Sequence, residues 1–204
     1  MTGTTLLEAM GKSQIETMTV FRFITFCWIA FVVYWWVSAW NVKKTVKPST
    51  LSSRLRHKVW LWLAIFLLVG AIPFYPLQIL VVPHSRATGL AGCAVCLLGL
   101  GITIWARRTL ARNWNVDVVF KEDHELITHG PYRYARHPIY TGLLTMFLGT
   151  AVARGRIDGF LAVVFCLLSF WIKLKQEEKL MLQHFPDSYP DYKQRVKALV
   201  PFVL

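Results

Sequence analysis

The chain has 204 residues, of which 55% are hydrophobic and only 17% are charged, and its formal net charge is +12. A soluble domain is typically about 25% charged, so these residues are too few to cover an ordinary soluble globule. The abundance of apolar residues and the count of only four cysteines also exclude a disordered chain and a disulfide scaffold. The composition therefore predicts a membrane protein.

Five runs without Asp, Glu, Lys or Arg indicate an all-α integral membrane protein. They contain 18, 24, 20, 16 and 14 residues and are Phe23–Trp40, Val59–Val82, Ala87–Ala106, Pro138–Ala153 and Gly159–Ile172. A helix needs about 20 apolar residues to cross the hydrocarbon core, so the first three runs qualify alone. We therefore predict about five transmembrane helices.

The last two runs are short, and we predict that they form a helical hairpin. Only the segment from Arg154 to Asp158 separates them, which would place a charged tip at an interface. Four spans with a re-entrant hairpin is the competing count. In the second run, Pro73 and Pro76 predict a kink or break, because proline lacks the helical N–H donor and clashes with the preceding turn.

The basic residues follow the runs in a regular way. They concentrate in the segments 41–58, 107–137 and 173–204, while few lie on the alternate connections. The preference of Lys and Arg for the cytoplasmic side predicts an outside N-terminus and a cytoplasmic C-terminus, and we expect a prokaryotic inner membrane. The charge fits contact with acidic lipid headgroups, and we expect no nucleic-acid partner because no binding module is present.

Two small-residue patterns occur in the third run. Cys93 and Cys96 have the spacing of a redox or metal pair, but no histidine lies nearby in this apolar stretch, so we interpret them as packing residues. The same run contains four glycines, which indicate close helix packing or room for a lipid tail: Gly89, Gly92, Gly99 and Gly101.

Polar chemistry is concentrated in the second half of the chain. All of the 11 acidic residues except Glu8 and Glu16 lie in residues 107–204. We therefore divide the chain into a three-span membrane scaffold, residues 1–106, and a cytosolic-side catalytic region, residues 107–204. The second part would comprise a cofactor loop, the helical hairpin and loops with short helices at the C-terminus.

The segment from His124 to Tyr140 is the most informative one. It reads as a polar loop with a turn at Gly130, followed by Arg136, His137 and Pro138. Proline suits the first position of a helix, and the free N–H groups behind it can receive an anion or lone pair. The pattern predicts a polar nest where a span meets the cytoplasm; ordinary interface anchoring is the alternative.

A second polar feature follows the last run. Lys173 and Glu177 are four residues apart and would share a helix face, and ionisable groups at this depth are candidates for function. Pro186 predicts the end of that helix. A short amphipathic helix is expected around Tyr189 to Val196.

Together these residues resemble the isoprenylcysteine carboxyl methyltransferase family and related phospholipid methyltransferases. The resemblance covers about residues 112–200. Its motifs are His124-x-Leu-Ile-x-x-Gly-x-Tyr132-x-x-x-Arg136-His137-Pro138-x-Tyr140-x-Gly142, then Glu177-Glu178, then Phe185-x-x-x-Tyr189-x-x-Tyr192-x-x-Arg195-Val196. The resemblance implies a helical membrane enzyme that uses S-adenosylmethionine (SAM), releases S-adenosylhomocysteine and has a cytosolic-face active site.

The resemblance also implies roles for individual residues. The residues implied in cofactor binding are His124, Glu125, Leu126, Ile127, Tyr132, His137, Pro138, Ile139, Tyr140, Glu177 and Glu178. Those implied in catalysis are Arg136, Lys173 and Glu177. Lys173 stands where the family tends to have an acceptor-orienting arginine, so this chain lacks the bidentate fork there. Methyl transfer from a sulfonium is an in-line displacement that needs no metal and no covalent nucleophile.

The absence of a G-x-G-x-x-G segment supports a cofactor site built from loops and helix ends, because no dinucleotide fingerprint is present. We expect membrane lipids and an amphiphilic methyl acceptor as partners. The acceptor remains open among a prenylated cysteine, an ethanolamine lipid, a fatty acid and a small thiol, and so does the oligomeric state. The alternatives are an NADPH-dependent sterol-type reductase, which cofactor preference would distinguish, and a non-catalytic scaffold, which would tolerate loss of His137 and Glu177.

Overall fold

The computed structural model describes residues 3–40, 51–72, 74–111 and 126–201, with side chains from residue 14 in the first range and from residue 57 in the second. These ranges contain helices and two isolated β-bridges but no strand, as predicted for an all-α protein. The helices are α1 (Gly3–Ala39), α2 (Leu51–Val69), α3 (Arg86–Leu110), α4 (Pro138–Arg154), α5 (Ile157–His184) and α6 (Tyr189–Arg195), with short 3₁₀ helices η1 (Tyr75–Gln78) and η3 (Gly130–Arg133).

A long helix forms at each of the five predicted runs, but they differ in length. Three described segments are long and apolar enough to cross a membrane: Gln14–Ala39, Arg86–Leu110 and Ile157–His184. Helix α4 has only 17 residues, and the apolar part of α2 is the shorter stretch His57–Val69. The structure therefore supports an integral membrane protein, and the count of five spans stays a prediction.

The second run is broken, as predicted, so it does not form the single span expected from its length, and the break lies earlier than the prolines. Helix α2 ends one residue before Gly70, whose φ of 72° lies in the left-handed region and ends the helix. The break therefore precedes Pro76, which lies in η1; Pro73 falls outside the described residues. The end of the run contacts Gly155, between the fourth and fifth runs, and the Val81 and Val82 amides both donate to the carbonyl of that residue.

Helices α3 and α4 approach each other through glycines, which is the first of the two interpretations of the glycine pattern in the third run. A Cβ atom on Gly99 would lie 2.5 Å from the carbonyl oxygen of Gly142, and one on Gly92 would lie 2.7 Å from that of Gly149. Only hydrogen fits between backbones at this separation. Gly101 is the exception, because a Cβ there would meet nothing within 4 Å.

Helices α4 and α5 form the predicted hairpin, with Gly155 in the left-handed region at its turn. Its charged tip is partly internal rather than fully exposed. The Asp158 carboxylate is 1% exposed, and its Oδ2 lies 3.2 Å from Arg154 Nη2 and 2.7 Å from Arg156 Nη2. The tip is thus an ion-pair cluster within the hairpin, and the backbone bonds of Val81 and Val82 to Gly155 join the hairpin to the residues following α2.

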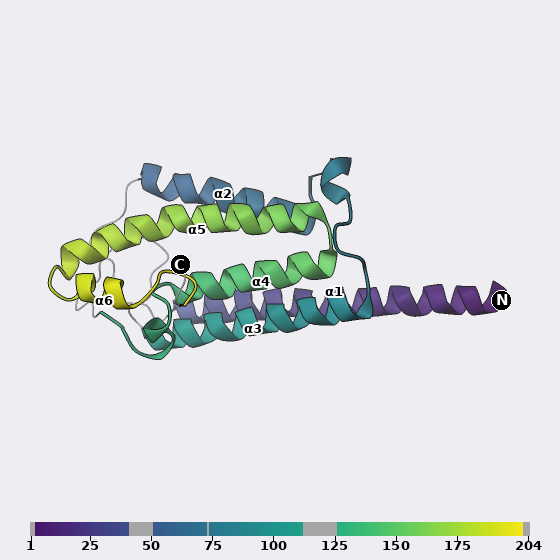
Figure 1. Ribbon diagram of the computed structural model, residues 1–204, viewed down its shortest axis with the longest axis horizontal. Coiled ribbons are helices and arrows are strands. Elements are labelled where there is room, and N and C mark those ends of the chain that lie inside the picture. The colour runs from purple at the N-terminus through teal and green to yellow at the C-terminus, as the bar shows by residue number, and fades with distance from the viewer. Residues whose placement is uncertain (1–2, 41–50, 73, 112–125, 202–204) are drawn as a thin grey trace.

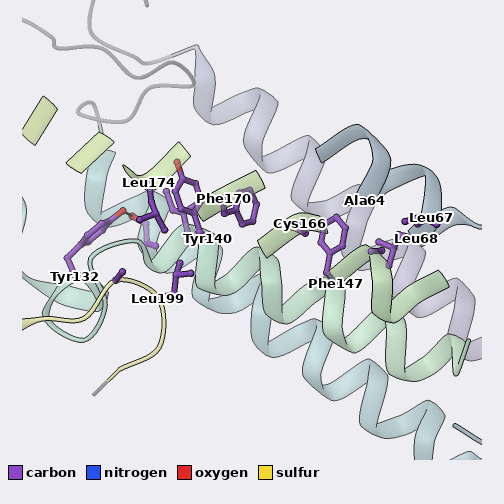
Figure 2. Close-up of a cluster of buried hydrophobic side chains, with 14 residues drawn as sticks. Ala64, Leu67, Leu68, Tyr132, Tyr140, Phe147, Cys166, Phe170, Leu174 and Leu199 are labelled. Carbon is purple, nitrogen blue, oxygen red and sulfur yellow. Dashed lines mark hydrogen bonds between the residues drawn. The ribbon is translucent and has the colours of Figure 1, made fainter. Parts of the chain in front are cut away.

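The helices alternate in direction, so their connections gather at two ends of the molecule (Figure 1). One end contains the N-terminus, η1 and the α4–α5 turn. The other contains the ends of α1, α3 and α5, the starts of α2 and α4, and α6. Cluster residues from α2, α4 and α5 run between these ends, and Tyr132, Tyr140, Phe170, Leu174 and Leu199 close it at the second end (Figure 2).

Candidate functional site

The predicted site residues that the structure describes lie at the end of the molecule where α5 ends and α4 begins (Figure 1). Leu126 and Ile127 are half-buried, and Ile127 packs against the core cluster. His124 and Glu125 lie outside the described residues. Tyr132, on η3, is buried, and its hydroxyl lies 3.4 Å from the carbonyl oxygen of Ala106 on α3.

The turn before α4 contacts the end of α5, which brings residues 40 positions apart into one cluster. His137 precedes the helix, and Pro138 occupies its first turn, as predicted. His137 Nδ1 lies 3.3 Å from Oε2 of Glu177. The Tyr140 hydroxyl donates to Oε1 of the same carboxylate at 2.6 Å. Both oxygens of Glu177 therefore face this turn.

Ring stacking holds these side chains in place. The rings of His137 and Tyr140 stack with centroids 5.4 Å apart and an angle of 5° between their planes. Tyr140 in turn stacks on Phe170 of α5, at 4.7 Å and 15°, and Figure 2 shows these two rings side by side. Ile139 is buried in the same cluster. The polar side chains of the site thus pack on buried apolar side chains, Ile139 and Phe170 among them, which we call the apolar floor.

Lys173 lies one turn before Glu177 on α5, and the predicted shared face is present. Its Nζ is 3.9 Å from Glu177 Oε1 and 5.5 Å from the centroid of the Tyr140 ring. The ammonium therefore borders both the carboxylate and the aromatic face. A cation in this position attracts an anionic group of a ligand and contributes a cation–π contact with the ring.

Glu178, the neighbour of Glu177, contacts a different set of partners. Its side chain is 4% exposed, and Oε1 accepts from Arg136 Nε at 2.9 Å. His137 Nε2 lies 3.6 Å from the same oxygen. The Arg136 guanidinium also donates to the backbone carbonyls of Lys193 and Val196. Protein groups thus engage Arg136 and Glu178, whereas the Glu177 side chain is 25% exposed.

The sequence did not predict the role of the C-terminal segment, which covers the start of α4. The Arg136 amide donates to the carbonyl of Lys197 at 2.8 Å, and the His137 amide donates to that of Ala198 at 2.9 Å. The Thr141 hydroxyl donates to the carbonyl of Leu199 at 2.6 Å. The helix start that we expected to be an open nest is therefore partly occupied by the chain itself. The apolar pair Ala198–Leu199 was the signal for burial of this segment.

Lys193 on α6 also contributes to the site, although its sequence position did not single it out. Its Nζ lies 2.9 Å from Oε2 of Glu178. The Tyr192 hydroxyl, next along the helix, donates to the carbonyl of Tyr132 at 2.6 Å. Burial raises the pKa of Tyr192, so its hydroxyl keeps the proton that it donates. The expected short helix near Tyr189 and the motif from Phe185 to Val196 both pointed to this part of the chain, but neither included Lys193.

The electrostatics of the cluster favour a protonated His137. Burial lowers the pKa of the imidazole, but the contacts with the Glu177 and Glu178 carboxylates outweigh it and raise the pKa above its ordinary value. An imidazolium there offers positive charge, and the partly exposed Glu177 offers an acceptor for hydroxyl or ammonium groups. Within the described part of the chain, no three His, Cys, Asp or Glu side chains are grouped to hold a metal.

One family model matches the region of the chain that contains His137, Tyr140, Glu177 and Glu178. A family model described as Phospholipid methyltransferase matches residues 87–188, which is half of the chain. A protein-S-isoprenylcysteine O-methyltransferase from Tribolium castaneum is 33% identical over 118 residues, covering 55% of this chain and 41% of the relative. The alignment thus spans less than half of that relative.

Two further similarities extend over more of the chain. A nickel-cobalt-cadmium resistance protein from Alcaligenes xylosoxydans xylosoxydans is 28% identical over 160 residues, covering 76% of this chain and 70% of the relative. The solved structure of a eukaryotic intramembrane Ras methyltransferase, isoprenylcysteine carboxyl methyltransferase, aligns over 76% of this chain and 54% of its own, at 25% identity and a TM-score of 0.47. On the extent of the family match, the chain belongs to the phospholipid methyltransferase family, as its motifs predicted.

Proposed function

We propose that this protein is a SAM-dependent integral membrane methyltransferase, which transfers a methyl group to an amphiphilic acceptor reached from the bilayer. The matching family model is described as Phospholipid methyltransferase, and the relatives of known name include isoprenylcysteine O-methyltransferases. The family match favours neither the reductase nor the scaffold alternative.

One observation carries the proposal: the 3.3 Å contact between His137 and Glu177. It joins the Arg-His-Pro-x-Tyr turn to the Glu-Glu pair, the two motifs on which the resemblance rests. Two motifs 40 residues apart that fold into one polar cluster, beside an apolar floor and at a helix end, form a surface suited to an amphiphilic cofactor and substrate.

The residues present fit SAM in their donor set. His137 Nε2 is buried beside Glu178 Oε1, at 3.6 Å, and makes no well-aligned hydrogen bond within the described residues, so it keeps donor capacity at this turn. The partly exposed Glu177 carboxylate can accept from hydroxyl or ammonium groups. We assign cofactor binding to Leu126, Ile127, Tyr132, His137, Pro138, Ile139, Tyr140, Glu177 and Glu178, together with His124 and Glu125, which lie outside the described residues.

When bound, SAM supplies a methyl group on a sulfonium, which a nucleophile takes as the carbon–sulfur bond breaks. The task of the chain is to align the acceptor and exclude water. Lys173 would orient an anionic acceptor, because its ammonium lies at the edge of the cluster. A carboxylate acceptor needs no proton removed, whereas an amine or thiol must lose one before or during transfer. Arg136 would assist by holding this turn in place.

We place the site on the cytoplasmic side of the membrane. The basic residues Arg107, Arg133, Arg136, Lys173 and Lys193 lie on elements at the end of the molecule that contains the site, and the N-terminus lies at the other end (Figure 1). This arrangement supports the orientation expected from the preference of Lys and Arg for the cytoplasm.

Calorimetric titration of purified protein with SAM tests the proposal directly. Wild type is expected to bind, and Glu177→Gln is expected to weaken binding about tenfold or more, because it removes the charge that accepts from Tyr140 and faces His137. Glu16→Gln is the matched control, since Glu16 is exposed on α1 away from the site. Incubation with methyl-labelled SAM and membrane lipid extract, followed by mass spectrometry, identifies the acceptor class.

The absence of heat with wild type, together with no label transfer to any lipid, thiol or prenylcysteine acceptor, would refute the proposal. Equal binding by wild type and Glu177→Gln would refute the assignment of this cluster as the cofactor site, even if methyl transfer occurred.

A further inference from the structure

The buried Glu178 carboxylate has a charged partner on a different element at each oxygen. Oε1 accepts from Arg136, in the turn before α4, and Oε2 lies 2.9 Å from Lys193 Nζ on α6. The ring closes through the backbone, because Arg136 Nη1 also donates to the Lys193 carbonyl at 3.1 Å. Three elements thus meet in one closed set of interactions among Arg136, Glu178 and Lys193.

We infer that Lys193 is a positioning residue for the cofactor site, acting through Glu178 to hold Arg136 and His137 in their places. This inference rests on the proposed function. Lys193 is not among the residues assigned to SAM, and its ion pair is with Glu178, so it would act on the site through that carboxylate.

The physical reason is the burial of Glu178. A carboxylate that is 4% exposed must have both oxygens satisfied, because a buried charge without partners is costly. Arg136 donates to only one of these oxygens, Oε1. Without the ammonium, the other oxygen would turn toward solvent or toward Arg136, and either movement displaces Oε1 from its place beside His137 Nε2.

The effect reaches the backbone of the site as well. The Arg136 and His137 amides donate to the carbonyls of Lys197 and Ala198, just after α6. Lys193 therefore ties the helix that leads into this segment to α5. Loss of the tie is expected to loosen the pairing between residues 135–137 and 197–199, which is the backbone support of His137.

Lys193→Met tests this inference, because it removes the ammonium while keeping the side-chain stem. We expect about tenfold weaker SAM binding, the loss expected for one charge-assisted hydrogen bond that is partly open to solvent. Amide hydrogen exchange at Arg136 and His137 should become faster by a similar factor. Lys193→Arg should retain the wild-type SAM affinity and exchange rates. Lys179→Met, which changes an exposed lysine on α5, should leave both quantities unchanged.

A double variant separates positioning from general destabilisation. If Lys193 acts through Glu178, then Lys193→Met should weaken SAM binding no further in a Glu178→Gln background. Full additivity of the two losses, or unchanged binding and exchange in Lys193→Met, overturns the inference. If wild type binds no SAM, the proposed function fails, and the exchange rates alone decide whether Lys193 holds the turn.

Discussion

The Tyr140 hydroxyl donates a 2.6 Å hydrogen bond to Oε1 of Glu177, and the two residues come from facing helices. The Tyr140 ring is simultaneously held between His137 and Phe170. This single side chain therefore links the polar edge of the site to its apolar floor. The orientation of Glu177 depends on a tyrosine whose own position is set by packing.

Tyr140→Phe is expected to weaken SAM binding about tenfold, because it removes one hydrogen bond to a charged group while the stacked ring remains. Calorimetric titration measures the change. Tyr134→Phe is the matched control, since Tyr134 is 46% exposed. An equal loss in both variants would contradict a specific role for the contact between Tyr140 and Glu177.

Stability is expected to depend on pH through His137, whose folded-state pKa is raised by Glu177 and Glu178 despite burial. A raised pKa means that the folded state holds the proton more tightly than the unfolded state. The contribution is therefore complete below about pH 6.5, and it is lost as pH rises through the folded-state pKa.

Thermal unfolding of wild type and His137→Gln, from about pH 6 to about pH 9, checks this expectation. The wild-type midpoint should fall relative to the variant as pH rises. A difference that stays constant, or grows, across the range would contradict it.

Gly99→Ala is expected to destabilise the fold by about 1–3 kcal/mol, because the new Cβ would lie 2.5 Å from the carbonyl oxygen of Gly142 and force α3 and α4 apart. Gly101→Ala is the matched control on the same helix. It meets nothing within 4 Å and should be neutral or stabilise the helix by up to about 1 kcal/mol. Unfolding midpoints in detergent distinguish the two, and similar midpoints would contradict glycine-mediated packing.

Asp158→Asn is expected to destabilise the protein by about 3 kcal/mol, because it leaves Arg154 and Arg156 without their buried counter-charge. The cluster lies at the opposite end of the molecule from the site (Figure 1). SAM affinity of the folded variant should therefore equal that of wild type. A lower unfolding midpoint with unchanged affinity supports a structural role, whereas weaker binding would contradict it.

Much of the fold follows from local rules. Uncharged runs predicted the positions of the five long helices, since only a helix satisfies its own backbone within an apolar segment. Pro138 marked the start of α4 and Pro186 the end of α5, because proline fits the first turn of a helix but cannot continue one. The break in the second run was expected at its prolines, but α2 ends earlier, because Gly70 adopts a left-handed conformation.

The candidate site was only partly accessible to such rules. The spacing of Lys173 and Glu177 on one helix determined that they share a face, and the motifs indicated which residues matter. The contacts of His137 with Glu177, and of Lys193 with Glu178, join residues distant in sequence. Only the tertiary structure decided these pairs, because the direction of each helix and the return of the C-terminal segment bring the partners together, and neither is encoded in local spacing.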